Sequence, residues 1–171
     1  MNYFIDRIIR AAKLDINLYE EVEADKTALL QSMMVVVLSS VAAGIGVIGK
    51  GGINVFLPGI ISALIGWLIW SYIAYIVGTK VLPTPETKAD YGELLRTIGF
   101  SSSPGLIRVL GIIPGLTWIV FIVAAIWMFA AMIIAIRQAL DYESTFRAFG
   151  VCIIGWIIQA VVLSIFFGLI R

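Results

Sequence analysis

The sequence predicts an all-α integral membrane protein that crosses the bilayer several times. Four stretches contain no charged residue, and they cover residues 27–49, 51–79, 109–136 and 148–170. These stretches are 23, 29, 28 and 23 residues long, and about 20 apolar residues in helical form are enough to cross the hydrocarbon core. The composition agrees, because 61% hydrophobic residues, 13% charged residues and a mean hydropathy of +1.03 are outside the range of a soluble domain of this length.

The residue types disfavour catalysis and nucleic-acid binding. The chain has no histidine and one cysteine, Cys152, and its acidic residues are confined to the N-terminal segment and the connections. No nucleophile with its base, metal site or phosphate-binding loop can be recognised, so we expect no enzyme activity, no metal and no cofactor. The basic residues Arg7, Arg10 and Lys13 are too few and too widely spaced to follow a nucleic-acid backbone.

Residues 1–26 are predicted to form an amphipathic and acidic cytosolic segment rather than a signal peptide, because they have no apolar central region. A helix is expected over residues 2–13. Its apolar positions are Phe4, Ile5, Ile8, Ile9 and Ala12, and its charged positions are Asp6, Arg7, Arg10 and Lys13. Such a helix lies either in the membrane interface or on the cytosolic face of the protein itself.

Residues 14–25 combine an apolar repeat with an acidic edge. Leu14, Leu18 and Val22 recur every four residues. The candidate partner-binding residues of this segment are Tyr19, Glu20, Glu21, Glu23 and Asp25. The carboxylates would suit a basic partner or a loosely held cation, and a merely solvated surface is the third interpretation.

The first two spans are expected over residues 27–49 and 54–78, with a tight turn at Gly49-Lys50-Gly51-Gly52 between them. Both spans are rich in small residues, which allow helices to approach closely. In the first span these are Ser39, Ser40, Ala42, Ala43, Gly44 and Gly46, and in the second Gly59, Ser62, Ala63 and Gly66. The second span ends in an aromatic half that contains Trp67, Trp70, Tyr72 and Tyr75.

Residues 91–113 are predicted to form an interrupted helix. Asp90 and Glu93 have the spacing of a capping box, which places the helix start at Tyr91. The run Ser101-Ser102-Ser103-Pro104 indicates a break and a new start, with Ser103 as N-cap and Pro104 as the first helical residue. Pro114-Gly115 ends the second half. Broken helices at membrane depth are tolerated where protein or a water-filled cavity satisfies the backbone.

Two further spans follow. One is expected from Thr117 to about residue 138, and a loop over residues 141–147 leads into the last, over residues 148–170. The last span carries Gln159 near its middle, and in hydrocarbon this amide is expected to find a hydrogen-bond partner. Gln159 serves either helix packing or a ligand contact.

The distribution of lysine and arginine predicts a cytosolic N-terminus. If residues 91–113 cross the membrane, nine basic residues lie on the cytosolic side and three, Lys50, Arg108 and Arg171, lie outside. If that segment enters and returns on one side, the count is again nine against three. Charge bias therefore leaves four and five spans open.

Three segments carry a resemblance to a known family. They are residues 14–25 (Leu-Asp-Ile-Asn-Leu-Tyr-Glu-Glu-Val-Glu-Ala-Asp), residues 94–101 (Leu-Leu-Arg-Thr-Ile-Gly-Phe-Ser) with Pro104, and residues 111–118 (Gly-Ile-Ile-Pro-Gly-Leu-Thr-Trp). In this order they resemble the prokaryotic branch of the Yip (Ypt/Rab-interacting protein) domain family over nearly the whole chain. The resemblance implies a domain over residues 27–171 with five transmembrane helices, the third broken or kinked, and a cytosolic N-terminus. Eukaryotic members are associated with Rab GTPases and vesicle traffic.

We therefore expect a multi-pass protein of the cell membrane that organises the membrane or binds a protein partner without catalysis. The alternative is a small-solute or ion carrier or channel built around the broken third helix. The candidate residues there are Glu93, Arg96, Gly99, Phe100, Pro104, Arg108, Pro114 and Gly115, together with Gln159 in the last span. The lipid bilayer is the expected environment, and a homo-oligomer is left open because small-residue faces serve packing within and between chains equally.

Overall fold

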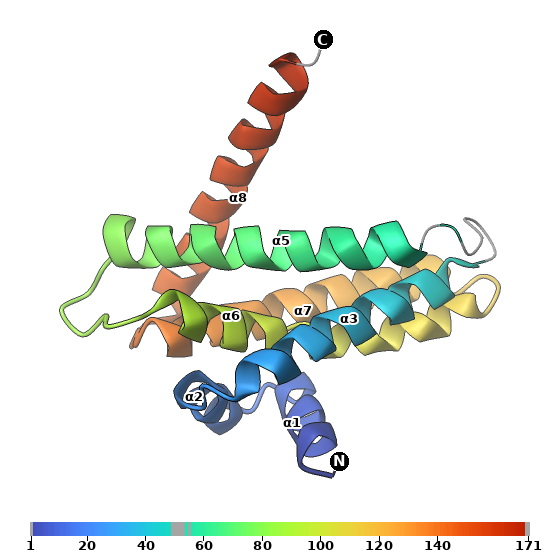
Figure 1. The fold of residues 1–171 in the computed structure, drawn as a ribbon, viewed down its shortest axis with the longest axis horizontal. Coiled ribbons are helices and arrows are strands. Elements are labelled where there is room, and N and C mark those ends of the chain that lie inside the picture. Colours follow the sequence, from blue (N-terminus) through green and yellow to red (C-terminus); the bar gives the residue numbers. More distant parts are fainter. Residues whose placement is uncertain (1, 49–53, 55, 170–171) are drawn as a thin grey trace.

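The structure is a computed structural model that describes residues 2–48, 54 and 56–169 of the chain (Figure 1). Every regular element in these residues is a helix. In chain order the elements are α1 (Asn2–Ala12), α2 (Ile16–Ala24), α3 (Ala28–Gly46), α5 (Phe56–Ile76), the π-helical η2 (Val77–Val81), α6 (Tyr91–Phe100), the 3-10 helix η3 (Ser103–Ile112), α7 (Thr117–Ala139) and α8 (Thr145–Leu169). The predicted turn Gly49-Lys50-Gly51-Gly52 lies outside the described residues.

Three of the described helices are long and apolar enough to cross a membrane. They are α3, the continuous helix over Phe56–Val81 that consists of α5 and η2, and α7. α8 has a further apolar stretch over Thr145–Val161. Because α8 begins at Thr145, the connection after α7 is shorter than the predicted loop over residues 141–147. The membrane class predicted from the uncharged stretches is confirmed.

The bundle consists of α3, α5, the segment α6–η3 and α7, which lie side by side along the long axis of the molecule (Figure 1). α8 leaves the bundle at an angle (Figure 1). The inner segment is α6–η3, which packs against both α3 and α7. Seven of the ten residues of α6 are buried, from Leu94 to Phe100. The interrupted segment is therefore the centre of the bundle rather than a peripheral hairpin.

The start of α6 confirms the predicted capping box. The Asp90 carboxylate accepts a hydrogen bond from the Glu93 amide at 2.9 Å, and the Glu93 carboxylate accepts one from the Asp90 amide at 2.7 Å. Two amides that the first helical turn leaves without intrahelical partners are satisfied in this way. Glu93 thus has a structural role at the position where the sequence predicted one.

The break occurs where the serine and proline residues predicted it, with two differences. The new helix starts one residue earlier, with Ser102 rather than Ser103 as N-cap, and it is a 3-10 helix. Pro104 has no amide to donate to the Phe100 carbonyl, and the Ser103 hydroxyl donates to that carbonyl instead, at 2.7 Å. A 3-10 helix rises about 2.0 Å per residue, so ten α-helical and ten 3-10 residues extend about 35 Å together.

Glycines on α3 and α6–η3 let these two segments run parallel in close contact. A Cβ on Gly99 would lie 2.6 Å from the Ser32 Cβ, and one on Gly46 would overlap the backbone carbonyl oxygen of Arg108. A Cβ on Gly111 would lie 3.1 Å from the Gly46 carbonyl oxygen. Because the contacts advance along both segments in the same direction, α6–η3 extends as far across the bundle as α3 does.

The N-terminal helices α1 and α2 pack on the flank of the bundle. Phe4 and Ile8 face the same buried cluster as Leu18 and Val22, whereas Ile5 and Ile9 point outward. Arg7, one of the charged positions of α1, is nevertheless buried, with only 1% of its side chain exposed. The reason is that α2 places the Glu21 and Asp25 carboxylates against this side of α1.

Candidate functional site

Arg7 joins the two N-terminal helices to the first span. Its guanidinium donates to the Glu21 carboxylate at 2.9 Å and to the Asp25 carboxylate at 2.8 Å. It also donates to the Gln31 side chain of α3 at 2.9 Å. Arg10 donates to Glu21 at 2.7 Å. Two of the predicted partner-binding carboxylates, Glu21 and Asp25, are therefore engaged within the chain.

The acidity of these two carboxyl groups reflects their hydrogen bonds. Burial alone would raise the pKa of Glu21, but hydrogen bonds from Tyr3, Arg10 and Arg7 outweigh it and hold that pKa at about 2. Hydrogen bonds from the Thr27 hydroxyl and from Arg7 lower the pKa of Asp25 to about 2. Both groups are therefore ionised at neutral pH and neutralise Arg7.

Arg96 attaches α6 to the end of α2. Its side chain is 5% exposed, and Nε donates to the carbonyls of Val22 and Glu23 at 3.0 and 3.1 Å, with Nη2 also donating to Glu23. The last carbonyls of a helix lack intrahelical donors and carry partial negative charge. The end of α2 therefore compensates the buried charge of Arg96.

Four carboxyl groups from three parts of the chain gather at this end of the bundle. The pKa of Glu23 is raised to about 7, chiefly by burial and in addition by the nearby Asp141, Glu93 and Glu20, while Arg96 acts in the opposite direction. Glu20 is exposed and accepts a hydrogen bond from Gln138 of α7 at 2.9 Å. We refer to Glu20, Glu23, Glu93 and Asp141 as the acidic end. Among the described residues, no group of three or more potential metal ligands is close enough to hold a metal ion.

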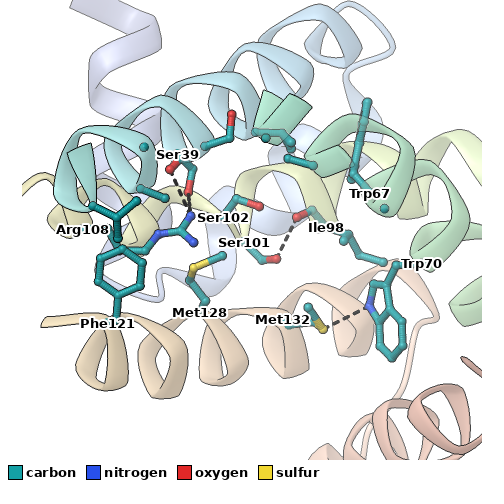
Figure 2. A pocket seen from close by; sticks show the side chains of 18 of the residues that line it. Ser39, Trp67, Trp70, Ile98, Ser101, Ser102, Arg108, Phe121, Met128 and Met132 are labelled. Atoms are coloured by element: carbon teal, nitrogen blue, oxygen red, sulfur yellow. Dashed lines mark hydrogen bonds between the residues drawn. The ribbon is translucent and has the colours of Figure 1, made fainter. Parts of the chain in front are cut away.

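In the other half of the bundle, a cavity of about 480 Å³ lies between α3, α5, α6–η3 and α7 (Figure 2). One part of its wall is polar, with Ser39 and Ser40 of α3, Ser101 and Ser102 at the break, and Arg108 of η3. The remainder includes the rings of Trp67 and Trp70 and the thioethers of Met128 and Met132. A volume of this size is typical of sites for small molecules.

Arg108 is half-buried at the polar part of the cavity. Its Nη2 donates to the Ser39 hydroxyl at 2.7 Å and to the Ser39 carbonyl at 3.0 Å, and its Nε donates to the Gly105 carbonyl at 3.0 Å. No carboxylate forms an ion pair with it in the part of the chain that the structure describes. All five ion pairs found there belong to Arg7 and Arg10.

Comparison with known proteins identifies a family for this chain. The sequence profile of the Yip1 domain matches residues 18–166. The chain belongs to the Yip1 domain family. The match begins in α2 and ends in α8, so it includes the whole bundle. Neither a curated protein sequence nor a solved structure matches the chain at a significant level.

In this Yip1-family protein the other predicted residues of the broken helix have structural positions. Gly99 contacts Ser32, Phe100 is completely buried against the N-terminal helices, and Pro104 is buried in the first turn of η3. Pro114 and Gly115 line a second hollow of about 360 Å³ at the turn before α7, where Gly115 has a φ of +85°. Of all these candidates, only Arg108 reaches the larger cavity.

Two other predicted residues lie apart from that cavity. Tyr19 is buried, and its hydroxyl donates to the Ala11 carbonyl at 3.3 Å, so it holds α2 to α1. Gln159 is half-buried on α8, and within the described residues its amide forms no hydrogen bond, in contrast to the expectation from the sequence. α8, which carries Gln159, leaves the bundle at an angle (Figure 1).

Sequence reasoning missed the cavity itself. The small residues of α3 and α5 were expected to bring helices together, and Gly46 does so with η3. Gly59 and Gly66 line the cavity instead, and a Cβ on either would meet nothing within 4 Å. A small residue permits close contact and open space equally, so the sequence carried no signal that distinguished the two.

Proposed function

We propose that this Yip1-family protein is a non-catalytic, five-span module of the cell membrane that binds a basic protein partner at its acidic end. The observation that supports this proposal best is that Asp141, which follows α7, lies near Glu20 and Glu23 of α2. Because Arg7 and Arg96 fix the N-terminal helix pair to the bundle, the carboxylates form a preorganised surface. The resemblance to trafficking proteins agrees with partner binding.

The proposed five spans rest on where the ends of the helices meet. Gln138, at the end of α7, donates to Glu20 of α2, so the end of α7 lies beside the N-terminal pair. Two points on the same side of the membrane are separated by an even number of crossings, and a cytosolic N-terminus makes that side the cytosol. α3, α5, α6–η3 and α7 supply four, and α8 would be the fifth.

Labelling with an impermeant thiol reagent tests this topology. We expect Glu86→Cys and Glu143→Cys, each in a Cys152→Ala background, to react only from the cytosolic side. Both positions are exposed in connections on the side of the acidic end. If Glu143→Cys reacted from outside while Glu86→Cys reacted from inside, α6–η3 would not cross the membrane and the proposal of five spans would be wrong.

Partner binding is tested by photo-crosslinking in native membranes. A crosslinking amino acid at Asn17, which is exposed one turn from Glu20, should give a defined adduct. We expect the combined substitutions Glu20→Gln and Asp141→Asn to reduce its yield at least about fivefold, and higher salt should reduce it too, because exposed charges are screened. These substitutions leave the carboxylates that hold Arg7 in place.

The matched control removes two exposed carboxylates elsewhere, with Asp6→Asn and Glu86→Gln. This variant has the same net charge as the test variant and should keep the adduct. An equal loss of adduct in both variants would show that overall charge, and not the acidic end, controls the interaction.

A further inference from the structure

Arg108 is a cation whose charge the described part of the protein leaves uncompensated. Its hydrogen-bond acceptors are two carbonyls and one hydroxyl, all neutral. Arg7, by contrast, pairs with two carboxylates, and Arg96 lies on the end of a helix. A half-buried guanidinium among apolar helices is costly unless an anion accompanies it. The wall of the cavity therefore carries an electrostatic preference for a negatively charged ligand.

The groups around Arg108 include donors that are still available. Arg108 Nη1 has no acceptor among the described residues. The Ser39 hydroxyl accepts a hydrogen bond from Arg108, and its own proton is not donated to any described residue. The Ser102 hydroxyl also forms no hydrogen bond there, and Ser102 lines the same cavity as Arg108 (Figure 2). A guanidinium and two hydroxyls are a suitable donor set for a phosphate oxyanion.

The remainder of the cavity is suited to hydrocarbon. The indole N–H of Trp67 donates to the Leu95 carbonyl at 3.0 Å, and that of Trp70 lies 3.1 Å from the Met132 sulfur. Both indoles thus have their polar atoms engaged and present apolar ring surface. Figure 2 shows these tryptophans at the end of the cavity opposite Arg108. The cavity is therefore amphipathic, with a cationic end and an apolar end.

The cavity is also accessible along α5. Gly59 and Gly66, which line it, are both exposed. They lie two turns apart on α5, a helix that also exposes Leu57, Ile61, Ile65 and Leu68. A molecule dissolved in the bilayer can thus approach through this face.

We propose that the cavity binds an anionic phospholipid, with its phosphate on Arg108, Ser39 and Ser102 and part of an acyl chain against Trp67 and Trp70. A free phosphate ion would use the same donors but would leave the apolar end unoccupied. This site lies in the other half of the bundle from the acidic end, so it does not depend on the proposed partner surface.

The test is native mass spectrometry of the purified full-length chain titrated with short-chain phosphatidylglycerol. We expect one bound lipid and a weaker affinity for zwitterionic phosphatidylcholine of the same chain length. Arg108→Gln should reduce the affinity for phosphatidylglycerol by about tenfold, which corresponds to one lost charge-assisted hydrogen bond. The matched control, Arg147→Gln, removes an exposed arginine in the first turn of α8 and should change the affinity less than about twofold.

A second variant keeps the proposal testable if Arg108→Gln does not fold. Gly66→Leu fills the apolar part of the cavity and leaves every hydrogen bond of Arg108 in place, and it should weaken lipid binding by a similar factor. Unchanged affinity in both variants would overturn the proposal and indicate only non-specific lipid association. Competition by inorganic phosphate at concentrations similar to those of the lipid would also overturn it, because the apolar end would then contribute nothing.

Discussion

Replacing Arg7 with methionine should destabilise the attachment of α1 by about 3 kcal/mol. Methionine keeps an unbranched apolar chain like the aliphatic part of arginine but leaves the carboxylates of Glu21 and Asp25 without their cation. Removing one partner of a buried ion pair costs about 3 to 5 kcal/mol, and the lower value is expected here because these carboxylates are 30% and 28% exposed and water compensates in part. Hydrogen exchange of the backbone amides in α1 and α2 measures the effect directly.

Arg10→Met is the matched control for this prediction. Arg10 also binds Glu21, but its side chain is 28% exposed, so its loss should cost about 1 kcal/mol or less. The amides of α1 should therefore exchange much faster in the Arg7→Met variant than in the Arg10→Met variant. Equal protection in the two variants would contradict the central role of Arg7.

Gly46→Ala should separate α3 from η3. The added Cβ would overlap the Arg108 carbonyl oxygen, which belongs to the backbone of η3 and cannot rotate away. Overpacking of this kind costs about 1 to 3 kcal/mol, and for a chain of this length the thermal midpoint should fall by roughly 2 to 12 °C. Thermal unfolding in detergent, monitored by circular dichroism, measures the shift.

Gly66→Ala makes the same chemical change where space is available. A Cβ there would meet nothing within 4 Å, and alanine in a helix interior restricts the unfolded chain, so we expect an unchanged or slightly raised midpoint, with a gain of about 0.5 kcal/mol. If the two alanine variants melted at the same temperature, the close contact between α3 and η3 would not contribute to stability.

The elements that the sequence predicted well depend on neighbouring residues. The capping box at Asp90 and Glu93 is set by residues three apart, and the break follows from Pro104, which has no amide hydrogen. The type of the second half could not be predicted in the same way. η3 is a 3-10 helix whose Arg108 and Gly111 contact Gly46 of α3, and these contacts join parts of the chain more than 60 residues apart.

The candidate site was predicted less completely than the fold. Arg108 was identified because a charge inside an apolar segment is conspicuous, but its partner Ser39 is 69 residues away. Glu21 and Asp25 were assigned to a partner surface, whereas Arg7 binds both of them within the chain. A carboxylate has the same appearance in a sequence whether its counterion belongs to the same chain or to another protein.

The amino-acid sequence alone predicts a helical membrane protein, the positions of its apolar segments and the interruption of the third. These properties follow from the hydrophobicity, length and backbone chemistry of consecutive residues. The surroundings of the arginines became visible only in the folded chain, where Arg7 and Arg96 bind groups of the protein and Arg108 faces a cavity. They could not be predicted because the energy of a charge depends on the groups around it in space, and these come from distant parts of the chain.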